Sequence, residues 1–195
     1  MRHKRVRRLI LPATLEGVEN DIYLDMLIDA AGRRSTEIIY ARAGDIFIFG
    51  DLMIECLYPF ENTIPANPNE HSLVKLISYG NLRFMMTGDI AVNTENEIIN
   101  HYGDFSDIMK ADVLKVSHHG SRHSSSERFL NTVGARYGII SVGRNPHGHP
   151  TREAVARIEA SGAVVLPTIG TGAVIVTTDG VDYSVKTMLG LELGH

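Results

Sequence analysis

Residues 114–126 read LKVSHHGSRHSSS, and the interpretation of the whole chain starts from this stretch. An apolar segment typical of a buried strand runs directly into two adjacent histidines, a glycine, a third histidine and a group of serines. Adjacent imidazoles seldom serve packing, and ligands gather where the strands of an α/β sheet end and their loops begin. The stretch therefore predicts a strand whose end carries a binding or catalytic site.

Strands and helices alternate around this stretch. Apolar residues at helical spacing predict helices over 93–102, 125–133 and 151–162, and Thr151 and Gly162 fit the start and the end of the last one. Short apolar runs predict strands over 82–88, 113–117, 137–143, 163–167 and 172–180. This alternation predicts a sheet that is covered by helices on at least one face.

The first half of the chain has a different pattern. A strand over 6–12 and a helix from Val18 to Gly32 are followed by short segments rich in branched and aromatic residues, with turns between them. These segments predict neighbouring antiparallel strands over 36–41, 45–50, 52–58, 72–79 and 82–88. No repeat or linker interrupts the chain, so we expect one domain over 1–195, with a basic terminus at 1–8 and a loosely held tail at 187–195.

The composition is that of a soluble globular protein, with 44% hydrophobic and 22% charged residues and a net charge of −4. This balance gives no general reason to expect polyanion binding, although Arg2, Lys4, Arg5, Arg7 and Arg8 make the start of the chain basic. The single cysteine excludes an internal disulfide. No apolar run approaches the roughly 18 residues that span a bilayer, and no secretion signal is visible, so the sequence leaves the localisation open.

Side chains suited to metal or phosphate chemistry follow three of the predicted strands. They are Asp89 after 82–88, His118, His119 and His123 after 113–117, and His147 and His149 after 137–143. A TGD turn alone is usually a hydrogen-bonded strand ending, and one histidine of a pair often only orients the other. Because the three loops open from neighbouring strand ends, we expect Asp89 and the imidazoles to form a cluster that binds zinc or another first-row divalent metal.

The motifs at 71–90, 111–126, 139–150 and 172–180, taken in this order, resemble the later part of the metallo-β-lactamase-fold domain of ComEC-type DNA internalisation competence proteins. The resemblance extends from about Val6 to about Gly180. It implies a partial αββα sandwich of the α/β (α+β) class, with a mixed sheet flanked by helices. It also implies metal-dependent phosphodiester hydrolysis with zinc or manganese, and DNA or another phosphodiester as the partner.

The resemblance assigns roles to individual residues. Asp89 would be a bridging metal ligand, and His118 and His119 would supply a metal ligand and a substrate-side imidazole, without deciding which is which. His149, with Asn145 nearby, would hold or protonate a phosphate oxygen, and it stays a possible ligand. Ser121 would form part of the same pocket wall.

One large part of the resemblance is missing. The superfamily carries an earlier HxHxDH loop that supplies most ligands of the first metal, and here the only upstream histidines are His3 and His71. We therefore expect at most one weakly held metal and little or no nuclease activity. Because half of the sandwich is absent, we also expect uncovered apolar residues such as Ile139, Val165 and Val174, and either a homo-oligomer or a complementing first half as partner.

Two other functions fit the sequence. One is a non-catalytic DNA-binding or assembly module, in which the basic start of the chain contacts phosphates. The other is a hydrolase of the same fold that acts on small phosphodiesters. Serine-hydrolase and phosphate-loop chemistry are excluded because neither a G-x-S-x-G nor a G-x-x-x-x-G-K motif is present.

Overall fold

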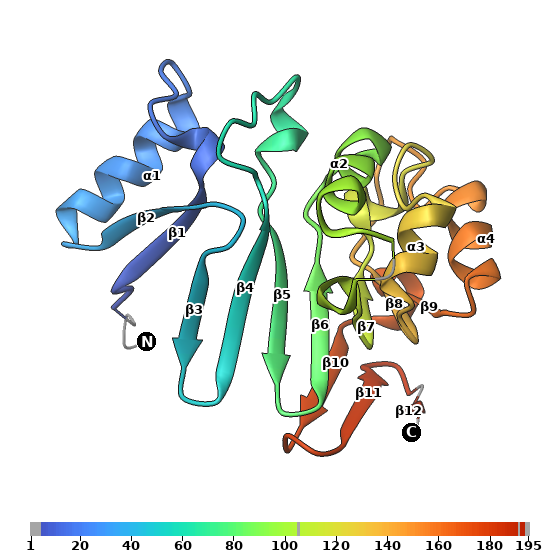
Figure 1. Ribbon diagram of the computed structural model, residues 1–195. Helices are drawn as coiled ribbons and strands as arrows, with labels where there is room; N and C mark the ends of the chain where they lie inside the picture. Colours follow the sequence, from blue (N-terminus) through green and yellow to red (C-terminus); the bar gives the residue numbers. More distant parts are fainter. Residues whose placement is uncertain (1–4, 105, 191, 194–195) are drawn as a thin grey trace.

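The computed structural model describes residues 5–104, 106–190 and 192–193, and a seven-stranded mixed sheet is the largest sheet within them (Figure 1). The strands lie in chain order: β3 (Ile46–Phe49), β4 (Leu52–Tyr58), β5 (Val74–Tyr79), β6 (Leu82–Met86), β7 (Val113–Lys115), β8 (Tyr137–Ile140) and β9 (Val164–Pro167). Strands β3 to β6 pair antiparallel, and β6 to β9 pair parallel. The parallel half brings the carboxyl ends of β6, β7 and β8 to one edge.

Three helices cover one face of this sheet and group at the right of Figure 1: α2 (Val92–Tyr102), α3 (Glu127–Val133) and α4 (Arg152–Ala160). They bury Ile98, Phe129 and Ile158 against Met85 and Leu114 of the sheet. The predicted cap is confirmed, because the Thr151 hydroxyl accepts from the Ala154 amide of α4. Short turns of helix complete this part: η2 (Pro68–His71), η3 (Asp107–Met109), η4 (Ser117–Gly120) and α5 (Thr168–Thr171).

A small antiparallel sheet covers part of the opposite face. It consists of β10 (Val174–Thr178), β11 (Tyr183–Thr187) and β12 (Glu192–Leu193). Val185 of β11 packs with Ile139, whose exposed fraction is 8%. The expectation that Ile139 is uncovered is therefore wrong, because sequence analysis predicted β10 but missed its partner β11. Val165 and Val174 are partly buried, the first on the helix-covered face and the second as part of β10, which packs against the cluster that contains Ile139.

The N-terminal part forms a separate unit at the left of Figure 1. Strand β1 (Arg8–Pro12) pairs parallel with β2 (Glu37–Ala41), and η1 (Ala13–Leu15) and α1 (Ile22–Arg33) connect them. The expected antiparallel pairing of 36–41 is wrong, since a crossover helix between two strands permits parallel pairing. Helix α1 begins after Asp21, whose side chain caps the amides of Tyr23 and Leu24, rather than at Val18.

The expected α/β class, a mixed sheet flanked by helices, is confirmed in the described residues. Residues 1–4 of the expected basic terminus and residues 191 and 194–195 of the expected tail lie outside the described residues. Within that tail, β12 pairs with β11.

Candidate functional site

The loops that follow β6, β7 and β8 bring the expected histidines and aspartate together. The Asp89 carboxylate lies 3.5 Å from His119, measured from Oδ2 to Nε2. The His118 ring lies 5.6 Å from the His149 ring and 6.5 Å from the His119 ring, between centroids. Three segments distant in sequence thus meet at one edge of the sheet.

The two adjacent histidines occupy an unusual backbone conformation. His118 and His119 have positive φ angles of 47° and 54°, and Gly120 follows with 80°. Side chains with a Cβ rarely adopt this left-handed region, which costs roughly 1–2 kcal/mol per residue. Such strain persists where surrounding contacts impose it, and here the His118 amide donates to the Gly88 carbonyl over 3.1 Å. The loop fixes the direction of both imidazoles.

The protonation of the His119 ring follows from its hydrogen bond. Nδ1 lies 2.6 Å from the Ser141 carbonyl oxygen, and because a carbonyl only accepts, Nδ1 carries the proton. In the neutral ring Nε2 is then an acceptor that faces Oδ2 of Asp89. A cation between the two acceptors, a water molecule that donates to both, or a proton on Nε2 would satisfy this arrangement. A zinc ion about 2.1 Å from each atom could contact both.

The described residues do not form a complete metal centre. Among the residues that the structure describes, no group of three or more His, Cys, Asp or Glu side chains is placed to hold a metal ion. Asp89 and His119 supply two ligand atoms, whereas stable protein zinc sites use three or four protein ligands. The described side chains therefore do not fit a resident metal by themselves.

Lys115, which sequence reasoning missed, faces Asp89 from β7. Its ammonium Nζ lies 3.6 Å from Oδ1 of Asp89 and donates to the Gly88 carbonyl over 2.9 Å. Burial lowers the pKa of Lys115, and the neighbouring Asp89 opposes this by raising it. The signal available in the sequence was a lysine in a short apolar strand directly before the histidine pair.

A cavity of about 680 Å³ opens beside this cluster. Its lining contains four histidines and one arginine but no carboxylate: His118, His119, Ser141, Val142, Gly143, Arg144, Asn145, His147, His149 and Thr168. Burial lowers the pKa of His149, and the nearby His118 and His147 add to this effect. Nδ1 of His149 is buried without a hydrogen-bond partner in the described residues. Imidazole and guanidinium donors without acids suit an anion such as phosphate.

Two expected site residues have other contacts. The side-chain amide of Asn145 forms its hydrogen bonds within its own loop. Nδ2 donates to the carbonyls of Gly143 and His149, and Oδ1 accepts from the amides of His147 and His149. Ser121 is 97% buried, with 3% of its surface exposed, and its hydroxyl accepts from the His123 amide. The structure therefore places both as residues that shape the loops.

A second cavity, also of about 680 Å³, lies between β4, the loop after it and α2. Four glutamates line it: Glu55, Glu61, Glu70 and Glu97. These carboxylates would repel a phosphate group, so the candidate phosphate site is the histidine cavity.

No family model matches the chain. In sequence, it is 31% identical to ComE operon protein 3 of Bacillus subtilis over 175 residues, which are 89% of this chain and 22% of that protein. It is 35% identical to competence protein ComA of Neisseria gonorrhoeae over 54% of this chain, and 33% identical to recombination protein 2 of Haemophilus influenzae over 69%. The matched segments span only 22%, 15% and 16% of the lengths of these relatives.

Among solved structures, a variant of the CmlA beta-hydroxylase aligns with 82% of this chain and 38% of its own, at 10% identity and a TM-score of 0.47. None of the described helices has the length and apolar character needed to cross a membrane. The match to ComE operon protein 3 covers 89% of the chain and therefore includes the motifs that carry Asp89 and the histidines. Over 89% of its length, this chain is homologous to one portion of the ComEC-type competence proteins.

Proposed function

We propose that the chain is the later part of a ComEC-like metallo-β-lactamase-fold domain and that it binds phosphodiesters of DNA in the histidine cavity. The observation that carries this proposal is the Asp89–His119 pair beside a cavity lined by four histidines and Arg144 without any acid. The relatives are named for competence and recombination, which supports DNA as the substrate.

The chain's own residues suffice for binding and fall short of catalysis. Arg144 and the imidazoles of His118 and His149 can donate to the non-bridging oxygens of a phosphate. Two-metal hydrolysis needs a pair of cations about 3.5–4 Å apart, and the described residues supply too few ligands for them. Zinc or manganese would be held firmly only when a complementing first half of the fold adds ligands. We therefore expect the isolated chain to bind DNA without cleaving it.

Binding can be tested by fluorescence anisotropy with a short labelled oligonucleotide. We expect Arg144→Gln and His149→Ala to weaken binding at least about fivefold, which corresponds to the roughly 1 kcal/mol of one ordinary hydrogen bond. Arg34→Gln, at an exposed position after α1, is the matched control and should leave binding unchanged. Equal binding by all variants would reject the cavity as the DNA site.

Catalysis is tested separately with the same oligonucleotide. We expect no cleavage by the purified chain in the presence of Mn²⁺ or Zn²⁺. Vigorous manganese-dependent cleavage that disappears in Asp89→Ala would overturn the expected inactivity. Competition by mononucleotides as strong as that by DNA would favour the small-phosphodiester alternative.

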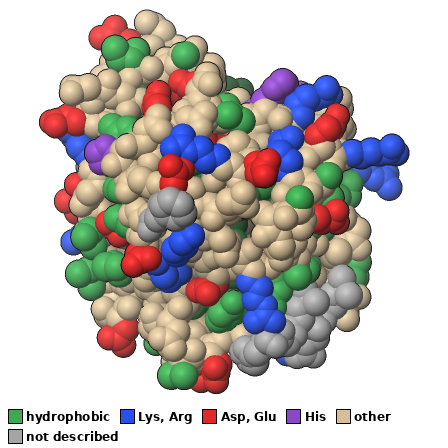
Figure 2. Space-filling model, turned by 45° about the vertical axis from the view of Figure 1, so that its right-hand side comes forward, with side chains coloured by type: hydrophobic (Ala, Val, Ile, Leu, Met, Phe, Trp, Pro, Cys, Tyr) green, Lys and Arg blue, Asp and Glu red, His purple; other side chains and the backbone are tan. Residues whose placement is uncertain are grey.

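The basic start of the chain is the competing DNA contact. Arg8 is paired with Glu37 over 3.2 Å, and on the face shown in Figure 2 the Lys and Arg side chains are interspersed with Asp and Glu. Binding that survives Arg144→Gln and instead weakens in Arg5→Gln/Arg7→Gln would favour a non-catalytic module. Its affinity would also fall steeply with salt.

A further inference from the structure

Asp89 is already engaged by a cation that belongs to the chain. Oδ1 of its carboxylate faces the Lys115 ammonium at 3.6 Å, while Oδ2 faces His119 at 3.5 Å. The Lys115 side chain is only 16% exposed and that of Asp89 is 35% exposed. A buried ammonium is costly to leave unpaired, so the two contacts of Lys115, to Asp89 and to the Gly88 carbonyl, hold it in this position.

The position of Lys115 follows from the sheet register. Lys115 pairs with Met86 of β6 and with Ile139 of β8, and Met86 in turn pairs with Lys75 of β5. Neighbours in register point to the same face, so Lys75 and Lys115 share one row of the sheet and lie two strands apart. The two lysines flank Met86 at the end of β6 from opposite sides, and the Lys115 ammonium reaches Asp89.

We propose that Lys115 is a built-in counter-ion of Asp89, which holds the carboxylate in place without a metal and must be displaced before a divalent cation can bind there. A cation between Asp89 and His119 would lie within a few ångströms of the ammonium, and like charges repel strongly in a partly buried site. The inference deepens the proposed function, since it concerns the same Asp89, but its test requires neither DNA nor activity.

Replacing Lys115 by an uncharged side chain of similar length isolates the charge. We expect Lys115→Met to bind Zn²⁺ at least tenfold more tightly than the wild-type chain. Lys115→Arg keeps the charge and should keep the weak affinity. If Lys115 only packs against the Gly88 carbonyl, Lys115→Met would change the stability and leave the Zn²⁺ affinity unchanged.

The experiment measures the Zn²⁺ affinity of the full chain by isothermal titration calorimetry. It compares the wild type, Lys115→Met, Lys115→Arg and the control Lys75→Met. The double variant Lys115→Met/Asp89→Asn shows whether the gain belongs to Asp89, because other histidines can also bind zinc. A gain that appears in Lys115→Met and vanishes in the double variant supports the proposal. Unchanged or weaker binding by Lys115→Met, or a gain that survives Asp89→Asn or appears in Lys75→Met, overturns it.

Thermal unfolding and a second variant separate an effect on zinc binding from an effect on folding. Thermal unfolding with a chelator should show a lower melting temperature for Lys115→Met than for Lys75→Met, with recovery when Zn²⁺ is added. If Lys115→Met does not fold, Lys115→Gln replaces it with the same expected gain. A failure of oligonucleotide binding with an intact zinc result would reject the proposed function alone.

Discussion

His118, His119 and Gly120 show how single residues set the geometry of the site. Their three consecutive positive φ angles turn the chain at the end of β7, so that one imidazole faces Asp89 and the other faces His149. Hydrogen bonds fix the turn on both sides. The His118 amide donates to the Gly88 carbonyl, and the Thr151 amide donates to the Gly120 carbonyl. A glycine is required at position 120 for conformation and for space.

Gly120→Ala tests this requirement. A Cβ at this position would lie 2.7 Å from Cβ of Pro150, in addition to the cost of a φ of +80°. We expect the free energy of unfolding to fall by about 2–4 kcal/mol, measured by urea denaturation. Gly148→Ala is the control, because its φ is +72° with nothing within 4 Å, and it should cost roughly 1–2 kcal/mol. Equal losses in the two variants would contradict the proposed role of the Pro150 contact.

The sequence predicted that Asp89 and the histidines of the loops after three strands would meet, because strand ends and loop chemistry are visible as patterns, and it left open which histidine faces Asp89. It did not predict Lys115, since its role depends on the register of β6 against β7. Nor did it predict that the Asn145 side-chain amide is hydrogen-bonded to His149 of its own loop, because these contacts depend on how the loop folds. The types of residue in the site could be predicted from the sequence, whereas the contact partners of each side chain depend on the folded structure.

At the scale of elements, the missed strand β11 changes the coverage of the sheet. The segment after Gly180 looked like the end of the fold, yet Tyr183, Val185 and Thr187 alternate along β11 and Val185 is fully buried. The sequence analysis assigned no element to 181–186 and began the loose tail at Thr187, because the segment YSVKT is short and mixed with polar residues.

Glu95 connects helices α2, α3 and α4 through the loop formed by residues 124–126. It lies in the first turn of α2, fully buried, and its carboxylate accepts from the Ser125 and Ser126 amides before α3. Arg157 of α4 donates to the Ser125 and Ser124 carbonyls of the same loop. Burial raises the pKa of Glu95, although these hydrogen bonds and Arg157 lower it in part.

This raised pKa predicts a pH-dependent stability. The folded state holds the Glu95 proton more tightly than the unfolded state. The stability that the protonated Glu95 contributes is therefore fully present below the ordinary pKa near 4.5, and it is lost as the pH rises through the pKa of the folded state. Glu95→Gln cannot ionise, so its unfolding free energy minus that of the wild type should increase between pH 4.5 and pH 7. Urea denaturation at several pH values measures the difference, with Glu97→Gln, at an exposed position of the same helix, as control. A difference that stays flat or decreases would contradict the assignment.

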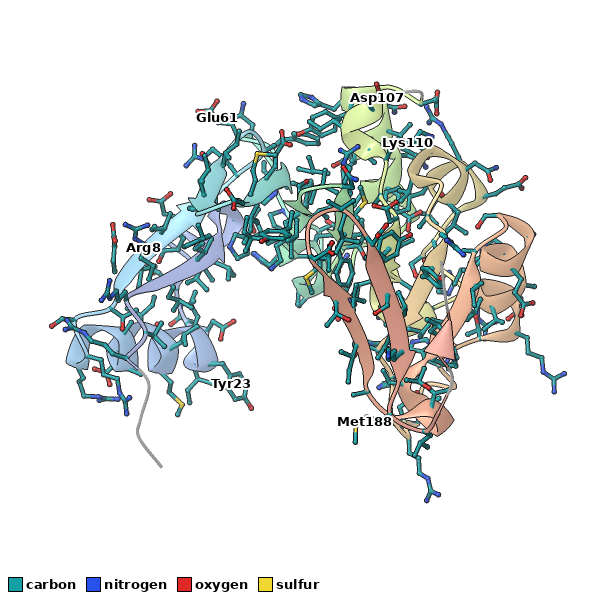
Figure 3. The ribbon with its side chains drawn as sticks, turned by 90° about the horizontal axis from the view of Figure 1, so that it is seen from below. Arg8, Tyr23, Glu61, Asp107, Lys110 and Met188 are labelled. Atoms are coloured by element: carbon teal, nitrogen blue, oxygen red, sulfur yellow. The ribbon has the colours of Figure 1, made fainter. Side chains whose placement is uncertain are left out.

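At the scale of the whole molecule, the layers leave apolar surface without a neighbour. The helices and the small sheet cover only part of the main sheet, and α1 exposes Ile22, Tyr23 and Met26 by 68%, 82% and 63%. Tyr23 projects from the surface in Figure 3. In the described residues β3 pairs only with β4, so its other edge carries free backbone donors and acceptors. Exposed apolar groups and an open strand edge each favour association with another chain.

We therefore expect the purified chain to self-associate, with a mass in light scattering that rises with concentration above that of one chain. Ile48, 70% exposed on the open edge of β3, is the residue to change, because a lysine on an edge strand opposes strand-to-strand pairing. Ile48→Lys should reduce the association at a given concentration by at least about tenfold, as the loss of one well-buried apolar contact would. Met188→Lys is the control, since Met188 is 69% exposed but lies after β11 rather than on the open edge of β3 (Figure 3). A wild-type chain that stays monomeric over the whole series would contradict this prediction, and equal effects of the two variants would place the contact elsewhere.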